Sequence, residues 1–295
     1  MAGSPVCVES PVFRLLTERS RRMANAARAS SAAAVMAGAM LCAPLAGCFT
    51  LDVPNPSFAV PRDEIAAEYR RLRETPQPLE RPVVVLNGYR GSHLRGLNLG
   101  SDIARLTSHD RNDVMVMSYP LASDIRSVSR RVVDAIDARW PSDDPTRTIE
   151  VDVIGFSMGG LAARHAALPQ SASGLDRRLA VRRLFTLATP HRGARAAVLA
   201  VDHAVSQMMP GAVFLAELDD ALDGADYELI PYAHTNDRIV GARNTAPLGR
   251  EPIWTAGTLT FSHFTITTNK RVLVDIARRL RGERPWAEPS EPPTN

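Results

Sequence analysis

The chain has little cysteine, and all of it lies near one end. Its three cysteines are Cys7, Cys42 and Cys48, so everything after residue 48 is free of cysteine. A disulfide framework and a paired-cysteine zinc site are therefore excluded for the folded body. The seven histidines form no HExxH motif and no closely spaced pair, which also argues against a metal centre. We expect neither a metal nor a cofactor.

An excess of charge of one sign is also missing from the body of the chain. The formal net charge of +3 comes from residues 1–47, which carry five arginines against two glutamates, and the rest balances 30 basic with 30 acidic residues. Proteins that bind nucleic acid usually carry a clustered basic surface, so we expect no nucleic-acid partner. With 45% hydrophobic and 23% charged residues over 295 positions, the composition is typical of a globular protein with one large domain or two small ones.

The longest uncharged apolar run lies at residues 29–47, "ASSAAAVMAGAMLCAPLAG", and arginines precede it. A charged start, an apolar centre and small residues at the end are the layout of a signal peptide. A transmembrane helix is the alternative, but the run is rich in alanine and Pro44 interrupts it. Met23 would be a more natural start than Met1 for such a peptide.

The run ends in "LAGC", which resembles the bacterial lipobox, in which the signal peptide is cut before a diacylated cysteine. The resemblance implies lipidation at Cys48 and a membrane partner, since two or more acyl chains anchor a protein stably. Phe49 follows instead of the aspartate associated with inner-membrane retention, so we expect the bacterial cell envelope and favour the outer membrane. The predicted organisation is a signal peptide (1–47), a tether (48–62), a folded domain (63–282) and a disordered tail (283–295).

Within the domain, apolar strand-like runs alternate with helical patterns. Such alternation predicts an α/β fold with a mostly parallel sheet covered by helices on both faces. Ligands of these sheets bind at the carboxyl ends of the strands, so we expect functional residues directly after the strands. The expected strands are 81–91, 113–120, 148–156, 181–190, 227–234 and 251–257, and the expected helices are 64–74, 100–110, 123–140, 158–168 and 269–282.

Groups suited to acyl transfer follow three of these strands. Ser157 follows one strand, Asp237 follows another and His263 follows the last, in the chain order Ser, Asp, His that α/β-hydrolases use. We interpret Ser157 as a nucleophile, His263 as its base and Asp237 as the acid that orients the base. The competing residues are His191 and His234 for the base and Asp226, which precedes its strand, for the acid.

The stretch from about 81 to 281 resembles a lipase- or esterase-type α/β-hydrolase. "GFSMGG" resembles the nucleophile elbow, with Gly155 and Gly159 around the serine, and "LFTLATPHRGA" resembles the TLxTPHxG segment of bacterial and glycosylphosphatidylinositol-deacylase-like lipases. "NGYRG" stands where those lipases have a His-Gly loop, with Asn87 in place of the histidine. The resemblance implies an oxyanion hole made by the backbone amides of Tyr89 and Met158.

We therefore expect a membrane-anchored serine hydrolase that cleaves carboxylic esters of lipophilic substrates. An acyltransferase or a thioesterase on the same fold and a non-catalytic surface lipoprotein are the alternatives, because a fold does not fix a substrate. Residues 194–223 are apolar and helical in pattern, and either a lid over the site or an ordinary crossover helix would explain them. Oligomeric state is left open.

Overall fold

The computed structural model describes residues 57–199, 202–258 and 261–292. The predicted signal peptide, the lipobox cysteine Cys48 and most of the predicted tether lie outside the described residues. Among the helices described, none is long and apolar enough to cross a membrane.

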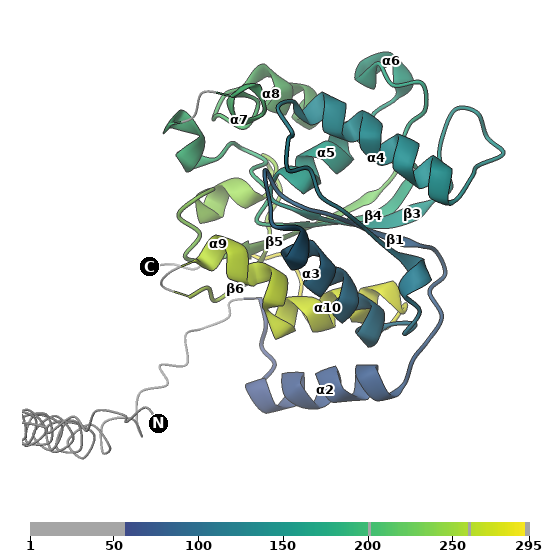
Figure 1. Cartoon of the computed structure of the whole chain (residues 1–295). Coiled ribbons are helices and arrows are strands. Elements are labelled where there is room, and N and C mark those ends of the chain that lie inside the picture. The colour runs from purple at the N-terminus through teal and green to yellow at the C-terminus, as the bar shows by residue number, and fades with distance from the viewer. Residues whose placement is uncertain (1–56, 200–201, 259–260, 293–295) are drawn as a thin grey trace, which may run out of the picture. The chain divides into compact units, whose positions relative to one another are not determined.

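The core of the domain is a six-stranded sheet in which every strand runs parallel to its neighbours, in the order β2-β1-β3-β4-β5-β6 (Figure 1). This confirms the predicted parallel α/β architecture, and each strand falls inside a predicted run. The strands are β1 (Val83–Leu86), β2 (Val114–Met117), β3 (Val151–Phe156), β4 (Val181–Leu187), β5 (Glu228–His234) and β6 (Ile253–Thr255).

Helices cover both faces of the sheet, as Figure 1 shows. Successive residues of β1 point to opposite faces, so Val84 and Leu86 pack into one hydrophobic cluster while Val83 and Val85 pack into the other. The first cluster holds α4 (Ile125–Arg139), α5 (Met158–Ala166) and α8 (Val213–Asp220), and the second holds α2 (Arg62–Glu74), α3 (His93–Leu106) and α10 (Lys270–Leu280).

Helix α3 begins seven residues before its predicted start at residue 100. Glycines hide its periodicity in the sequence, because Gly96 and Gly100 lie on the face that packs against the sheet. A Cβ at Gly96 would lie 2.3 Å from the Asn87 side-chain nitrogen, so the helix can approach the sheet only with glycine there. The short helices α6 (Gln170–Ser173) and α9 (Ser262–Thr265) were not predicted, and α7 (His203–Ser206) lies in the helical pattern of residues 194–223.

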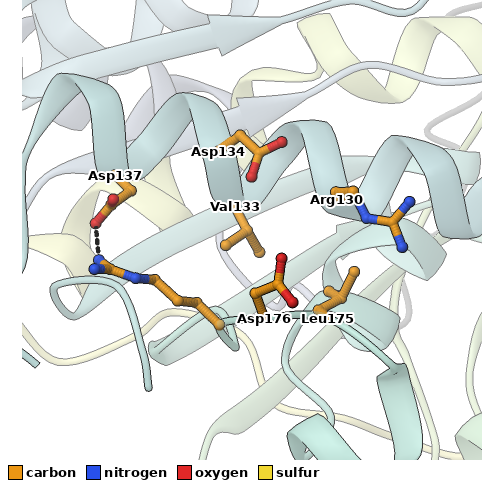
Figure 2. Close-up of a pocket in the computed structure, with 7 residues that line it drawn as sticks. Arg130, Val133, Asp134, Asp137, Leu175 and Asp176 are labelled. Carbon is orange, nitrogen blue, oxygen red and sulfur yellow. Dashed lines mark hydrogen bonds and ion pairs between the residues drawn. The ribbon is translucent and has the colours of Figure 1, made fainter. Parts of the chain in front are cut away.

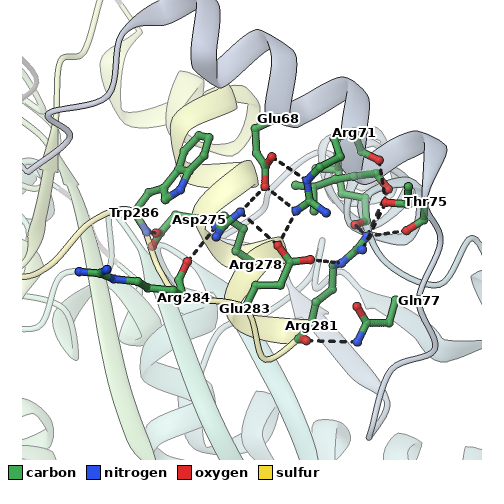
Figure 3. Close-up of polar contacts among 12 residues, drawn as sticks. Glu68, Arg71, Thr75, Gln77, Asp275, Arg278, Arg281, Glu283, Arg284 and Trp286 are labelled. Carbon is green, nitrogen blue, oxygen red and sulfur yellow. Dashed lines mark hydrogen bonds and ion pairs between the residues drawn. The ribbon is translucent and has the colours of Figure 1, made fainter.

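A polar network joins α2 to α10 and continues into the segment that follows α10 (Figure 3). Glu68 of α2 accepts hydrogen bonds from Arg71 and Arg278, and this pairing with Arg71 lowers the pKa of Glu68. The backbone amides of Trp286 and Ala287 donate to Asp275 at 2.7 and 3.1 Å. The predicted disordered tail therefore differs from the structure over these residues, since Asp275 supplies a buried acceptor that no sequence pattern reveals.

A close approach of backbone to backbone lies where β3 turns into α5 beside the end of β1. A Cβ at Gly155 would lie 2.5 Å from Gly160 Cα, and one at Gly159 would lie 2.3 Å from the Leu86 carbonyl oxygen. These contacts are shorter than any packed carbon makes, and the neighbouring atoms belong to the backbone and cannot turn aside. Glycine is therefore required at both positions.

Gly159→Ala should lower the free energy of unfolding by about 3 kcal/mol, at the upper end of overpacking costs, because its methyl group meets backbone. Alanine's better helix propensity, about 1 kcal/mol, offsets this only in part. Gly224→Ala is the matched control, since its nearest atom would lie 4.0 Å away, and it should change stability by less than about 0.5 kcal/mol. Urea denaturation of both variants measures the difference, and equal stabilities would refute the packing argument.

Candidate functional site

Ser157 occupies a strained backbone position at the start of α5. Its φ of +52° and ψ of −124° are rare for any residue except glycine. Three hydrogen bonds hold it there: its amide donates to the Leu187 carbonyl at 2.9 Å, and its carbonyl accepts from the Gly160 amide at 3.1 Å and from Thr189 Oγ1 at 2.9 Å. Strain of about 1–3 kcal/mol persists only where surrounding contacts enforce it, and such positions cluster at functional sites.

Three distant residues form one hydrogen-bonded chain at the carboxyl edge of the sheet. His263 Nε2 lies 3.1 Å from Ser157 Oγ, and His263 Nδ1 lies 2.8 Å from Asp237 Oδ2. His263 is 4% exposed and Asp237 is 3% exposed, while Ser157 keeps partial access to solvent. The structure thus brings together the three residues that the sequence proposed as nucleophile, base and acid.

The other oxygen of Asp237 is also occupied. Asp237 Oδ1 accepts the backbone amides of Ile239 and Val240 at 2.9 and 3.0 Å. With this oxygen fixed, Oδ2 is turned toward the imidazole, so Nδ1 carries the hydrogen and Nε2 is free to accept one from the serine. This is the tautomer that a general base for Ser157 requires.

The alternative candidates for the base and the acid either lie away from Ser157 or have their polar atoms bonded to other groups. Burial and the nearby Arg164 lower the pKa of His191 far below its usual range, and its two nitrogens contact Arg164 at 2.9 Å and Thr186 at 3.0 Å. Burial also lowers the pKa of His234, which contacts the Ser262 carbonyl at 2.7 Å. Asp226 pairs with Arg178 ahead of β5, away from the carboxyl edge.

The two residues predicted to supply oxyanion donors belong to the two segments that adjoin the serine. Met158 is the first residue of α5, so its amide has no acceptor inside the helix. The loop that carries Tyr89 touches the elbow, since a Cβ on Gly88 would lie 3.0 Å from Ser157 Cβ. Asn87, which stands where similar lipases have histidine, holds this loop by donating to Ser118 Oγ at 2.6 Å.

A mostly apolar cavity of about 270 Å³ opens beside Ser157. Val205 and Met208 line it from the segment around α7, and Ile239 and Val240 line it from the loop after β5. The remaining lining residues are Gly88, Tyr89, Gly91, Arg95, Phe156, Pro190, Ala194, Ala196, Ala197, His263 and Phe264. Such a cavity suits an aliphatic chain held next to the serine.

Residues 194–223 are neither one crossover helix nor a single lid helix where the structure describes them. They form a 3₁₀ turn (Arg195–Leu199), α7 and α8, with residues 200–201 outside the described part. Arg164 and Arg126 fix α8, the first through the Leu218 carbonyl at 2.7 Å and the second through Glu217. The stretch next to α7 therefore borders the cavity, whereas α8 packs on the helical layer; whether any part moves as a lid stays a prediction.

A second hollow, of about 150 Å³, lies between α4 and the loop before β4 (Figure 2). Asp134, Asp137 and Asp176 face it together with Arg130 and Arg177, and Arg177 pairs with Asp137. This hollow is at the amino end of β4, opposite to the edge that carries Ser157. Among the described residues, no group of three or more His, Cys, Asp or Glu side chains could hold a metal ion.

Comparisons with known proteins identify the fold. No family model matches the chain, and no curated protein matches it. The propeptide form of a Bacillus licheniformis lipase, BlEst2, matches 74% of this chain at 17% identity with a TM-score of 0.53, and the chain spans about half, 54%, of that protein. The mature form of the same lipase matches 66% of this chain over 89% of its own length, at 18% identity and a TM-score of 0.48.

A thioesterase of Streptomyces coelicolor, RedJ, matches 69% of this chain over 92% of its own length, at 16% identity and a TM-score of 0.38. The chain has the α/β-hydrolase fold. Identities this low establish the architecture alone, so the chemistry of this chain must be argued from its own residues.

Two residues of the site were missed by sequence reasoning. Phe264 and Arg95 line the cavity, and the Phe264 ring packs edge-on against His263 with the ring centroids 5.2 Å apart. Phe264 could have been found because it is next to His263 in the chain. Arg95 could not, since the part of α3 that carries it was not recognised as helical.

Asp237→Ala should slow the labelling of Ser157 by a fluorophosphonate by about 10⁴-fold, because His263 loses the partner that fixes its tautomer. Asp226→Ala removes a carboxylate from the same strand's other end and should label at the wild-type rate. The labelling rate constants of the two variants and of the wild type give the comparison. A slow Asp226 variant beside a fast Asp237 variant would contradict this assignment of the acid.

Proposed function

We propose that the protein is a serine hydrolase that cleaves carboxylic esters of lipophilic substrates through Ser157, His263 and Asp237. One observation carries the proposal: a serine, an imidazole and a carboxylate form a continuous hydrogen-bonded chain at the mouth of an apolar cavity. A binding protein on the same fold has no need for a strained, partly exposed serine joined to a buried imidazole and carboxylate.

The reaction follows from the geometry. His263 Nε2 takes the proton of Ser157 as Oγ attacks the ester carbonyl, and Asp237 stabilises the imidazolium that forms. The amides of Met158 and Tyr89 bind the developing oxyanion, and each such donor is worth about 2.7–4 kcal/mol of transition-state stabilisation. The imidazolium then protonates the leaving alcohol, and water, activated by the same imidazole, releases the acid from Ser157.

The chemical nature of the acyl chain is inferred from the lining of the cavity. Its walls offer Val205, Met208 and Ile239 to a substrate, and methionine adapts to chains of different shape. Each methylene group that leaves water contributes about 0.8 kcal/mol, so longer acyl chains gain binding energy until the cavity is full. This favours an aliphatic carboxylic ester over a small polar one.

A fluorophosphonate probe should label the chain that starts at residue 49, and Ser157→Ala should abolish the labelling. On 4-nitrophenyl esters from acetyl to dodecanoyl, kcat/KM should rise with chain length before it levels off. No labelling would reject the hydrolase. Labelling combined with a maximum at two to four carbons would leave an esterase and reject the preference for lipophilic acyl groups.

We also propose that the mature protein is anchored in a bacterial cell envelope by acyl chains on Cys48, with the outer membrane as the favoured site. The support is the pattern at residues 29–48, an apolar run that ends in "LAGC". The membrane would then lie close to the source of lipophilic esters.

Expressed in a bacterial host with a radiolabelled fatty acid, the full chain should incorporate the label and sediment with membranes. Cys48→Ser should lose the label and keep the uncleaved apolar run, whereas Cys42→Ser, a matched change within that run, should be labelled normally. Equal labelling of both variants would overturn the anchor at Cys48.

A further inference from the structure

The cavity beside Ser157 contains one permanently charged side chain. Its lining is aliphatic, aromatic or glycine apart from Ser157, His263, the Tyr89 hydroxyl and Arg95. Arg95 belongs to the first turn of α3, and the segment around α7 contributes Val205 and Met208 to the same cavity. A guanidinium in a wall that is otherwise apolar requires an explanation, because aliphatic substrates gain nothing from it.

Aromatic rings hold the guanidinium in place. Its carbon lies 4.6 Å from the centre of the Phe264 ring and 5.9 Å from the centre of the Phe156 ring. Both rings also pack against the His263 imidazole, at centroid distances of 5.2 and 5.1 Å. The same two rings thus contact both Arg95 and the His263 imidazole.

No carboxylate of the described residues pairs with this charge. Within residues 57–199, 202–258 and 261–292, the side chain of Arg95 makes no hydrogen bond and no ion pair. The neighbouring arginine of the oxyanion loop behaves differently, since Arg90 contacts Asp202 at 3.3 Å. Arg105, farther along α3, likewise contacts Asp102 at 3.5 Å.

Helix stability does not explain the residue either. A cation in the first turn opposes the positive end of the helix dipole, and this first turn contains no acidic residue. The side chain of Ser92, the residue before the helix, makes no capping hydrogen bond. The charge of Arg95 thus adds to the positive end of the α3 dipole beside this cavity.

We propose that Arg95 is a specificity-determining residue that binds an anionic group on the substrate, so that the preferred ester is an amphiphile with a carboxylate or a phosphate near its scissile bond. The inference rests on the proposed hydrolase function. The planar guanidinium pairs with either anion through two parallel hydrogen bonds, and the ring faces behind it leave its edge for the ligand. The aliphatic part of the same substrate occupies the apolar walls.

Two matched substrate pairs test the proposal and separate the sources of the anion. The carboxylate arm compares 4-(butanoyloxy)benzoate with 4-(butanoyloxy)benzamide, and the phosphate arm compares 1-butanoylglycerol 3-phosphate with 1-butanoylglycerol. Wild type should favour the anionic member of at least one pair by about 10-fold to 100-fold in kcat/KM, as expected for a hydrogen-bonded charge. The arm with the larger ratio identifies the anion.

Variants of Arg95 distinguish binding of the substrate anion from packing against the Phe264 ring. Arg95→Gln should abolish the preference through a loss on the anionic member alone, and Arg95→Lys should keep part of it. Arg105→Gln, the same change on an exposed part of α3, should keep the wild-type ratio. Equal losses on both members in Arg95→Gln would mean that the residue only supports the Phe264 ring, and would overturn the proposal.

A wild type without preference in either pair would overturn it as well. Failure of the hydrolase itself has a different signature, namely no cleavage of any of the four esters and no fluorophosphonate labelling at Ser157. A protein that is labelled and cleaves neutral and anionic members equally keeps the proposed function and loses only the anion site.

Discussion

The close approach of β1, β3 and α5 at residues 155–159 is the constraint on which the rest of the site depends. It is possible only because the two positions that face backbone are glycines, Gly155 and Gly159. The tight turn between β3 and α5 holds Ser157 at a positive φ, and α5 begins at the next residue, Met158. The position of Ser157, its backbone strain and the unpaired first amide of α5 at Met158 thus follow from a single packing contact.

Burial and hydrogen bonding then divide three histidines that look alike in the sequence. His191 and His234 are buried with their nitrogens engaged, and burial lowers the pKa of both, so each is a neutral structural bridge. Only His263 joins a carboxylate on one side to a serine hydroxyl on the other. Asn269 donates to the second nitrogen of His234 at 3.1 Å, so that ring has both of its nitrogens engaged.

The sequence predicted the parts of the structure that depend on regular spacing. The order of strands and helices and the three residues after strands 3, 5 and 6 follow from apolar periodicity and from the rule that parallel strands end at a common edge. Prediction from the sequence failed where contacts between distant residues, and not the local sequence pattern, determine the structure. Glycines concealed the start of α3. Residues 286 and 287 were predicted from composition to be part of a disordered tail, but their amides bind the buried Asp275.

The same distinction explains why most of the cavity wall was not predicted from the sequence, whereas the three residues at its rim were. Ser157, Asp237 and His263 are each placed by following a strand. Arg95 of α3 and Val240 of the loop after β5 line one cavity only because the tertiary structure brings their segments together. The Tyr89 hydroxyl donates to Asp202, the residue that caps α7, and so ties the oxyanion loop to the α7 wall. Because an apolar wall strengthens the attraction between a charge and its partner, one guanidinium in such a wall discriminates between substrates more sharply than the same group would on an open surface.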